Sequence, residues 1–126
     1  MNEEDCQNLL DYWQNKYIGF ITPHPDFIGF ANLGNKTRGI TTYRAHYKYN
    51  REDDTVKKTE GWGEIKLNSK LKANWRIKAV LWHEFCHHWA YSVFNYTQHQ
   101  GRFDDCLRTD KKLWLLGSLS RIILLF

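Results

Sequence analysis

The sequence predicts an α+β fold in which an antiparallel or mixed sheet of about three strands packs on one long helix, with further helices flanking it. Three patterns carry this prediction: apolar residues at helical spacing over 4–18, strand-rich segments at 27–33, 39–50 and 56–67, and a long apolar helical pattern over 74–94. The 126 residues suffice for one hydrophobic core and not for two, so we expect a single domain over residues 1–126.

The elements follow one another in a clear order. Leu10, Trp13 and Tyr17 fall on one face of the first helix, and the two prolines of residues 21–26 break the chain after it. In the segment 39–50, tyrosines alternate with charged residues at period two, and a polar turn follows at 51–54.

The second half of the chain is predicted to be mainly helical. The helix over 74–94 has Asn74 or Ser69 as its candidate cap, and a polar loop follows it at 95–101. We expect a further helix over 104–116. Residues 121–126 fit either a terminal strand or the end of that helix.

Composition and charge restrict the partners and the cellular compartment that we expect. The formal charge of +4 fits a solvated surface better than contact with nucleic acid or an acidic partner. Three widely spaced cysteines without a CxxC pair do not form a disulfide framework, and Cys86 is interpreted as a small core residue. The N-terminus is acidic and lacks an apolar leader. The apolar residues 113–126 are too few to span a membrane. We therefore expect an intracellular protein, cytoplasmic or, in a eukaryotic cell or viral host, nuclear.

The chemistry is concentrated in residues 83–87, which read His-Glu-Phe-Cys-His, an HExxH motif. On a helix His83 and His87 lie one turn apart on the same face, so both imidazoles can bind one zinc ion. Glu84 lies beside them and can take a proton from a zinc-bound water. Two imidazoles on a helix that is apolar on both sides need partners, which a metal supplies. His88 projects away from this face and is interpreted as a supporting or surface residue.

The chain resembles the SprT-like metalloproteases, the group that includes the Spartan proteases of DNA–protein crosslinks. The resemblance covers about a third of the chain, in three segments: Gly-Glu-Ile-Lys-Leu-Asn-Ser at 63–69, Ala-Val-Leu-Trp-His-Glu-Phe-Cys-His at 79–87, and His-Gln-Gly-Arg-Phe at 99–103. It implies a zincin-like fold, hydrolysis of peptide bonds in proteins, including proteins held on DNA, and a third zinc ligand at His99. We expect no zinc ribbon or other accessory module within 1–126.

Chain geometry also favours His99 as the third ligand. A helix that runs to Phe94 has risen roughly 10 Å past His87, and five extended residues recover at most about 17 Å. The chain can return to the metal if the helix ends near Phe94 or Asn95, and Asn95 suits a left-handed stop. Phe103 could then anchor the returning segment. No histidine other than His99 follows His88, so the alternatives are Asp104 and Asp105.

The sequence is compatible with two functions. The first is a zinc metallopeptidase in which the strand 62–67 lies at the sheet edge beside the metal, where Gly61 and Gly63 admit a substrate backbone. The second is a non-catalytic, basic nucleic-acid-binding or adaptor domain with a structural zinc. Glu84 favours the first, because a structural site has no use for a base and usually has four protein ligands.

Overall fold

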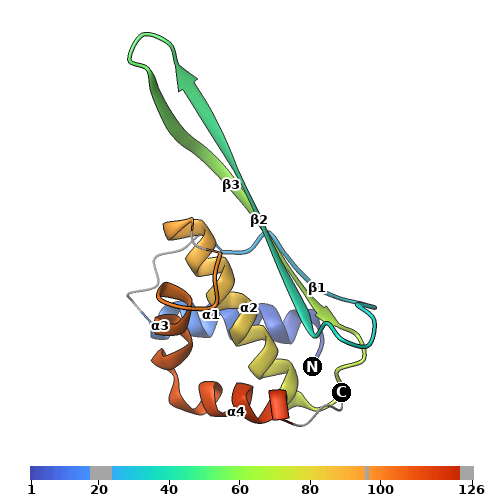
Figure 1. The fold of residues 1–126 in the computed structure, drawn as a ribbon. Coiled ribbons are helices and arrows are strands. Elements are labelled where there is room, and N and C mark those ends of the chain that lie inside the picture. The colour runs from blue at the N-terminus through green and yellow to red at the C-terminus, as the bar shows by residue number, and fades with distance from the viewer. Residues whose placement is uncertain (18–23, 96, 123–126) are drawn as a thin grey trace.

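The computed structural model describes residues 1–17, 24–95 and 97–122, and it confirms the α+β class (Figure 1). The described residues form four helices and three strands. In chain order these are α1 (Glu3–Lys16), β1 (Phe27–Ala31), β2 (Gly39–Asn50), β3 (Thr55–Asn68), α2 (Asn74–Phe94), α3 (Arg102–Thr109) and α4 (Lys111–Ile122).

The strands form a mixed sheet in the order β1-β3-β2. β2 is antiparallel to β3, whereas β1 is parallel to β3, pairing Phe27 with Glu64 and Ala31 with Asn68. The prediction that residues 62–67 form an edge strand is therefore wrong. β1 occupies the side of β3 that would otherwise be free, so the edge strand nearest the long helix is β2.

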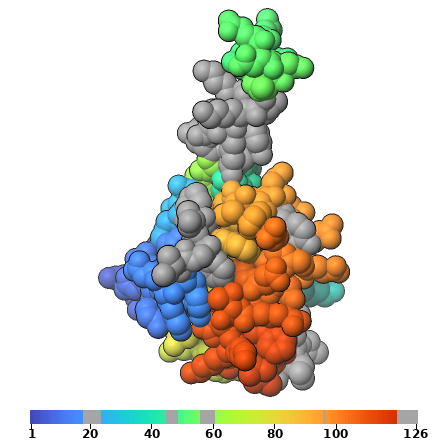
Figure 2. All heavy atoms as spheres, turned by 90° about the vertical axis from the view of Figure 1, so that its left-hand side faces the viewer, coloured from blue at the N-terminus to red at the C-terminus, as the bar shows by residue number. Residues whose placement is uncertain are grey.

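The β2–β3 hairpin is longer than the rest of the sheet. Its register runs from Gly39 opposite Leu67 to Asn50 opposite Thr55, with a shift between His46 and Tyr47. Only the first part of β2 lies beside the helices, and the hairpin tip stands away from the body (Figures 1 and 2).

The core lies where α1 and the sheet meet α2. Cys6, Leu10 and Trp13 form the buried face of α1, and the Trp13 ring packs edge-on against Trp82 of α2 at 5.0 Å. A capping box between Asn2 and Asp5 begins α1. Burial of these aromatic rings holds α2 in place.

The long helix has the predicted bounds but not the predicted cap. Its N-cap residue is Ala73, which offers no side-chain hydrogen bond, so neither Asn74 nor Ser69 serves as the cap. At the other end Asn95 adopts the left-handed conformation with φ 53°, as expected. The chain therefore leaves α2 directly after Phe94.

The C-terminal region consists of two helices where one helix over 104–116 was predicted. They are separated at Asp110, whose extended backbone interrupts the helical hydrogen bonds. The Asp110 carboxylate accepts hydrogen bonds from the Leu113 N–H (3.0 Å) and the Tyr17 hydroxyl (2.6 Å). It thus caps α4 and joins it to the end of α1. Residues 121 and 122 belong to α4, and 123–126 lie outside the described residues.

The cysteines also differ from expectation. Cys86 of α2 and Cys106 of α3 form a disulfide, with 5.6 Å between their Cα atoms. Spacing in the sequence could not reveal this pair, because it depends on how α3 docks on α2. Cys6 is a free, buried thiol. Within the described residues, no helix is long and apolar enough to cross a bilayer.

Candidate metal centre

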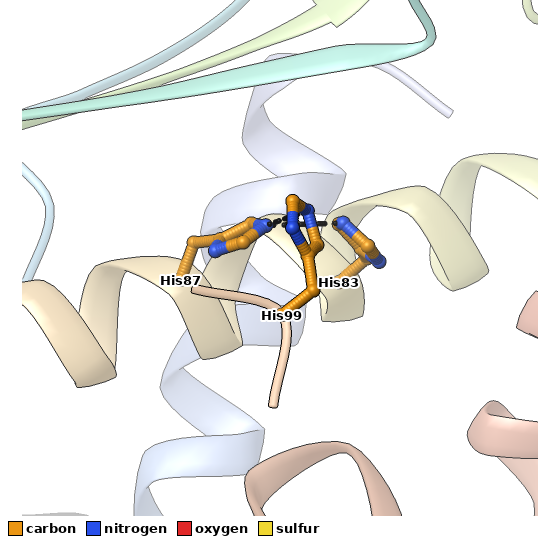
Figure 3. Close-up of side chains that lie close together, drawn as sticks. All are labelled: His83, His87 and His99. Atoms are coloured by element: carbon orange, nitrogen blue, oxygen red, sulfur yellow. Dashed lines mark hydrogen bonds between the residues drawn. The ribbon is translucent and has the colours of Figure 1, made fainter. Parts of the chain in front are cut away.

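Three histidines from two segments converge at the middle of α2 (Figure 3). The Nε2 atom of His87 lies 3.2 Å from Nε2 of His83 and 3.1 Å from Nε2 of His99. The candidate ligand atoms of all three lie within 4.8 Å of one another. This arrangement brings together the three residues that the sequence predicted as metal ligands, close enough to hold one metal ion.

The two shorter separations suit a tetrahedral metal. Two imidazole nitrogens bound to one zinc ion at 2.0–2.1 Å lie about 3.3 Å apart, close to the two measured separations. Burial lowers the pKa of His87 to about 4, with the neighbouring His99 acting in the same direction. His87 is therefore neutral at pH 7, which is the form of imidazole that binds a metal.

The segment that carries His99 reaches the helix by the route that the chain length required. Asn95 turns the chain out of α2, and Gly101, with φ 58° and ψ −117°, turns it into α3. His99 lies between these two turns and is solvent-exposed. The histidine on α2 nearest to it, His87, is buried, so the cluster has one open side.

Aromatic rings position the imidazoles. Phe103, only 1% exposed, stacks on His87 with 4.0 Å between ring centroids and meets His83 and His99 edge-on. Tyr91 also lies nearly parallel to the His87 ring, at 5.5 Å. The Nδ1 atom of His87 is buried and has no hydrogen-bond partner among the described residues. Ring packing therefore holds His87 in place, and Phe103 is the anchor that the sequence argument expected.

Glu84 lies one residue after His83 and is 5% exposed. The Thr41 hydroxyl is within hydrogen-bond distance of its carboxylate and 3.0 Å from its main-chain oxygen. Burial raises the pKa of Glu84 to about 7, although the Thr41 hydrogen bond opposes the rise. A carboxylate with a pKa near neutrality is suited to accept a proton during a reaction.

Sequence reasoning missed two residues of β2, Gly39 and Thr41. A Cβ atom on Gly39 would lie 2.8 Å from Cγ of Glu84 and 2.9 Å from Val80, so only glycine lets β2 approach α2 this closely. The signal was present, since Gly39 begins a strand otherwise rich in β-branched and aromatic residues. The sequence does not show, however, which helix Gly39 would face.

Gly63 serves a different purpose from the one expected. A Cβ atom there would lie 2.3 Å from His88, so this glycine accommodates a side chain of α2 and does not face a substrate. His88 is 1% exposed, and its ring meets Tyr43 of β2. His88 is thus a buried residue on the sheet side of α2, about 100° round the helix from His87.

The remaining candidates lie elsewhere. The Nε2 atom of His24 is 2.8 Å from the carboxylate of Asp11. Asp104 pairs with Arg108 at 2.9 Å, and neither Asp104 nor Asp105 joins the described metal-ligand cluster. Tyr96 lies outside the described residues, as does the side chain of His46.

The chain has no match among protein-family models, curated proteins or solved structures.

Proposed function

We propose that this protein is a zinc metallopeptidase of the SprT-like type, with a zincin-like fold. The observation that carries the proposal is the convergence of His83, His87 and His99 beside the buried carboxylate of Glu84. Three imidazoles with one open side leave room for a reactant, as catalytic zinc sites do. A carboxylate adjacent to them provides the base that hydrolysis requires.

Each residue has a definite task in this proposal. His83, His87 and His99 would hold the zinc ion, which when bound supplies a Lewis acid that makes water nucleophilic near neutral pH. Glu84 accepts the proton from the attacking water and passes it to the leaving amine. Thr41 keeps the Glu84 carboxylate oriented, and Phe103 keeps the imidazoles in register.

The substrate backbone would lie along β2. Its inner edge pairs with β3, and on its outer edge no strand is paired within the described residues. Gly39 and Thr41 place that strand directly against Glu84. An extended peptide that adds to this edge by main-chain hydrogen bonds would carry its carbonyl groups past the histidines. In this proposal the first half of β2, and not residues 62–67, is the edge strand that pairs with the substrate.

The non-catalytic alternative explains fewer observations. A purely structural zinc site would be expected to close with a fourth protein ligand, whereas three histidines cluster in the described part of the chain. It also leaves the burial of Glu84 unexplained, because burying an ionisable group costs free energy and such groups are concentrated at functional sites.

The direct test is proteolysis of a disordered basic protein by the purified chain. We expect cleavage products by mass spectrometry when the protein carries zinc and none after chelation, with activity restored by zinc. Adding single-stranded DNA to a parallel reaction tests whether DNA-held proteins are the preferred substrates. Absence of cleavage with a fully zinc-loaded protein, with and without DNA, would contradict the proposal.

A further inference from the structure

A cavity of about 650 Å³ lies beside the histidine cluster. His83, Glu84 and His99 form part of its wall, and it extends from there to the face of α4 that carries Leu113, Gly117 and Ser118. This volume is in the range of pockets that bind small molecules or large side chains. The metal centre and the cavity are therefore one continuous space.

The walls that α2, α3 and α4 contribute away from the histidines carry mostly apolar side chains. Among the described residues they include Ala79, Val80, Leu107, Leu113 and Trp114. Polar residues border the cavity mostly on the side of the β1–β2 connection, at Lys36, Thr37 and Arg38. Asp104 also lines the cavity, and its carboxylate forms an ion pair with Arg108. The helical side of the cavity therefore favours an apolar group, because contact with these side chains removes apolar surface from water.

Gly117 is the informative residue of this wall. Glycine inside a helix is less favourable than alanine because it loses more backbone freedom on folding. Packing among the described residues does not require it, since a Cβ atom at Gly117 would meet none of their atoms within 4 Å, and its φ is not in the left-handed region. What the missing side chain does provide is open space on the α4 side of the cavity.

We infer that this cavity is a specificity pocket for a large apolar side chain next to the scissile bond, and that Gly117 sets its depth. The inference rests on the proposed peptidase function. Because Glu84 and two of the three histidines line the same cavity, a side chain that fills it belongs to a residue flanking the attacked carbonyl. The substrates are then peptides with tryptophan, phenylalanine or leucine at that position.

The test compares two quenched fluorescent peptides of otherwise identical sequence. One has tryptophan on both sides of the bond that is cut, and the other has alanine at both positions. The wild-type protein should cleave the tryptophan peptide with the higher kcat/KM. Gly117→Leu should lower the tryptophan-to-alanine ratio of kcat/KM at least about tenfold, a usual cost of misfit in an apolar pocket. Alanine has a helix propensity close to that of leucine but a smaller side chain, so Gly117→Ala should give an intermediate ratio.

Lys112→Leu is the matched control, because it adds the same side chain to an exposed position of α4 outside the cavity. Its ratio should equal that of the wild type, and thermal unfolding should confirm that all variants fold. A wild type that cleaves both peptides equally well, or a Gly117→Leu variant with an unchanged ratio, would overturn the inference while leaving the peptidase proposal intact.

A second measurement does not depend on zinc or on catalysis. Indole titrated into the metal-free protein should bind saturably by NMR, shifting resonances of residues that line the cavity. Gly117→Leu should weaken that binding at least about tenfold, whereas Lys112→Leu should not. Failure of indole to bind the wild-type protein would show that the cavity does not accept apolar rings, whatever the outcome of the cleavage assays.

Discussion

The Nε2 atoms of His87 and His99 lie 3.1 Å apart, although 12 residues separate the two histidines in the chain. An extended segment of that length spans about 40 Å, so the contact depends on a reversal of direction. The left-handed Asn95 provides the reversal immediately after α2. Phe103 then fixes the returning segment by stacking on His87 at 4.0 Å.

The first prediction concerns zinc content. Protein purified without chelator should contain about one zinc ion per chain. Changing His99 to alanine should lower zinc affinity at least about 100-fold. Loss of a group that only supports a metal ligand already lowers metal affinity by up to about 100-fold, and loss of a ligand itself should cost no less. Helical content by circular dichroism should stay close to that of the wild type. His24→Ala, at a histidine bound to Asp11 outside the cluster, is the control and should keep its zinc. Equal zinc content in both variants would exclude His99 as a ligand.

The second prediction concerns the contact between β2 and α2. Gly39→Ala places a methyl group 2.8 Å from Cγ of Glu84, so the carboxylate or the strand must shift. We expect kcat/KM to fall at least about tenfold, because small displacements of a catalytic group are costly. Zinc content should be unchanged. Ile40→Ala alters the exposed neighbouring residue and should have little effect. Full activity in Gly39→Ala would show that this approach does not position Glu84.

The third prediction concerns stability at low pH. Burial alone would raise the pKa of Asp110, but hydrogen bonds from Tyr17 and from backbone N–H groups outweigh it and hold that pKa below its ordinary 3.8. A carboxylate with a depressed pKa contributes stability above its unfolded-state pKa and loses it as the pH falls through the folded-state value. Asp110→Ala should therefore cost about 1–2 kcal/mol at neutral pH, as for other lost helix caps.

Denaturant titrations at several pH values measure this effect. The difference in unfolding free energy between wild type and Asp110→Ala should shrink progressively below pH 3.8. Asp53→Ala, in the exposed turn of the hairpin, should show no comparable difference at any pH. A constant difference from pH 7 to pH 2 would mean that Asp110 stabilises α4 without its charge.

The sequence was most informative where local patterns are strong. The bounds of α2 and β2 follow from periodicity and β-propensity, and the end of α2 follows from Asn95. The break between α3 and α4 was missed although Asp110 is a suitable cap residue, because the apolar pattern continues across it; the bond from Tyr17 that also holds Asp110 depends on tertiary packing. The central place of β3 was also missed, since the five residues of β1 carry no signal for the strand they join.

The site was predictable to the extent that its residues lie on one helix or within reach of it. His83 and His87 share a face by spacing, and chain length restricted the third position to His99 or the following aspartates. Thr41, Gly39 and the cavity wall at Gly117 come from elements whose docking depends on tertiary packing. No local pattern encodes such long-range contacts, so these residues required the structure.

The fourth prediction concerns the Cys86–Cys106 disulfide, which joins the helix carrying the HExxH motif to the helix that follows His99. Closing a loop of 20 residues is worth about 3 kcal/mol in the chain-entropy model. For metal-free protein, reductant should lower the unfolding free energy of the wild type by about that amount. Cys106→Ser should already have the lower value and should not respond to reductant.

Cys6→Ala is the control for the disulfide, because Cys6 is a buried free thiol. This variant should retain the full response to reductant. If wild-type stability is the same with and without reductant, then the disulfide contributes nothing to holding α3 on α2.

We propose that Glu84 is the base of a zinc peptidase, and replacing it by glutamine tests this role. The amide is isosteric and can keep the Thr41 contact but cannot take a proton. We expect the variant to keep its fold and one zinc ion per chain while hydrolysis of a protein substrate falls at least about 1,000-fold, a loss within the range supplied by acid–base catalysis. Cleavage at the wild-type rate by fully zinc-loaded Glu84→Gln would contradict the account.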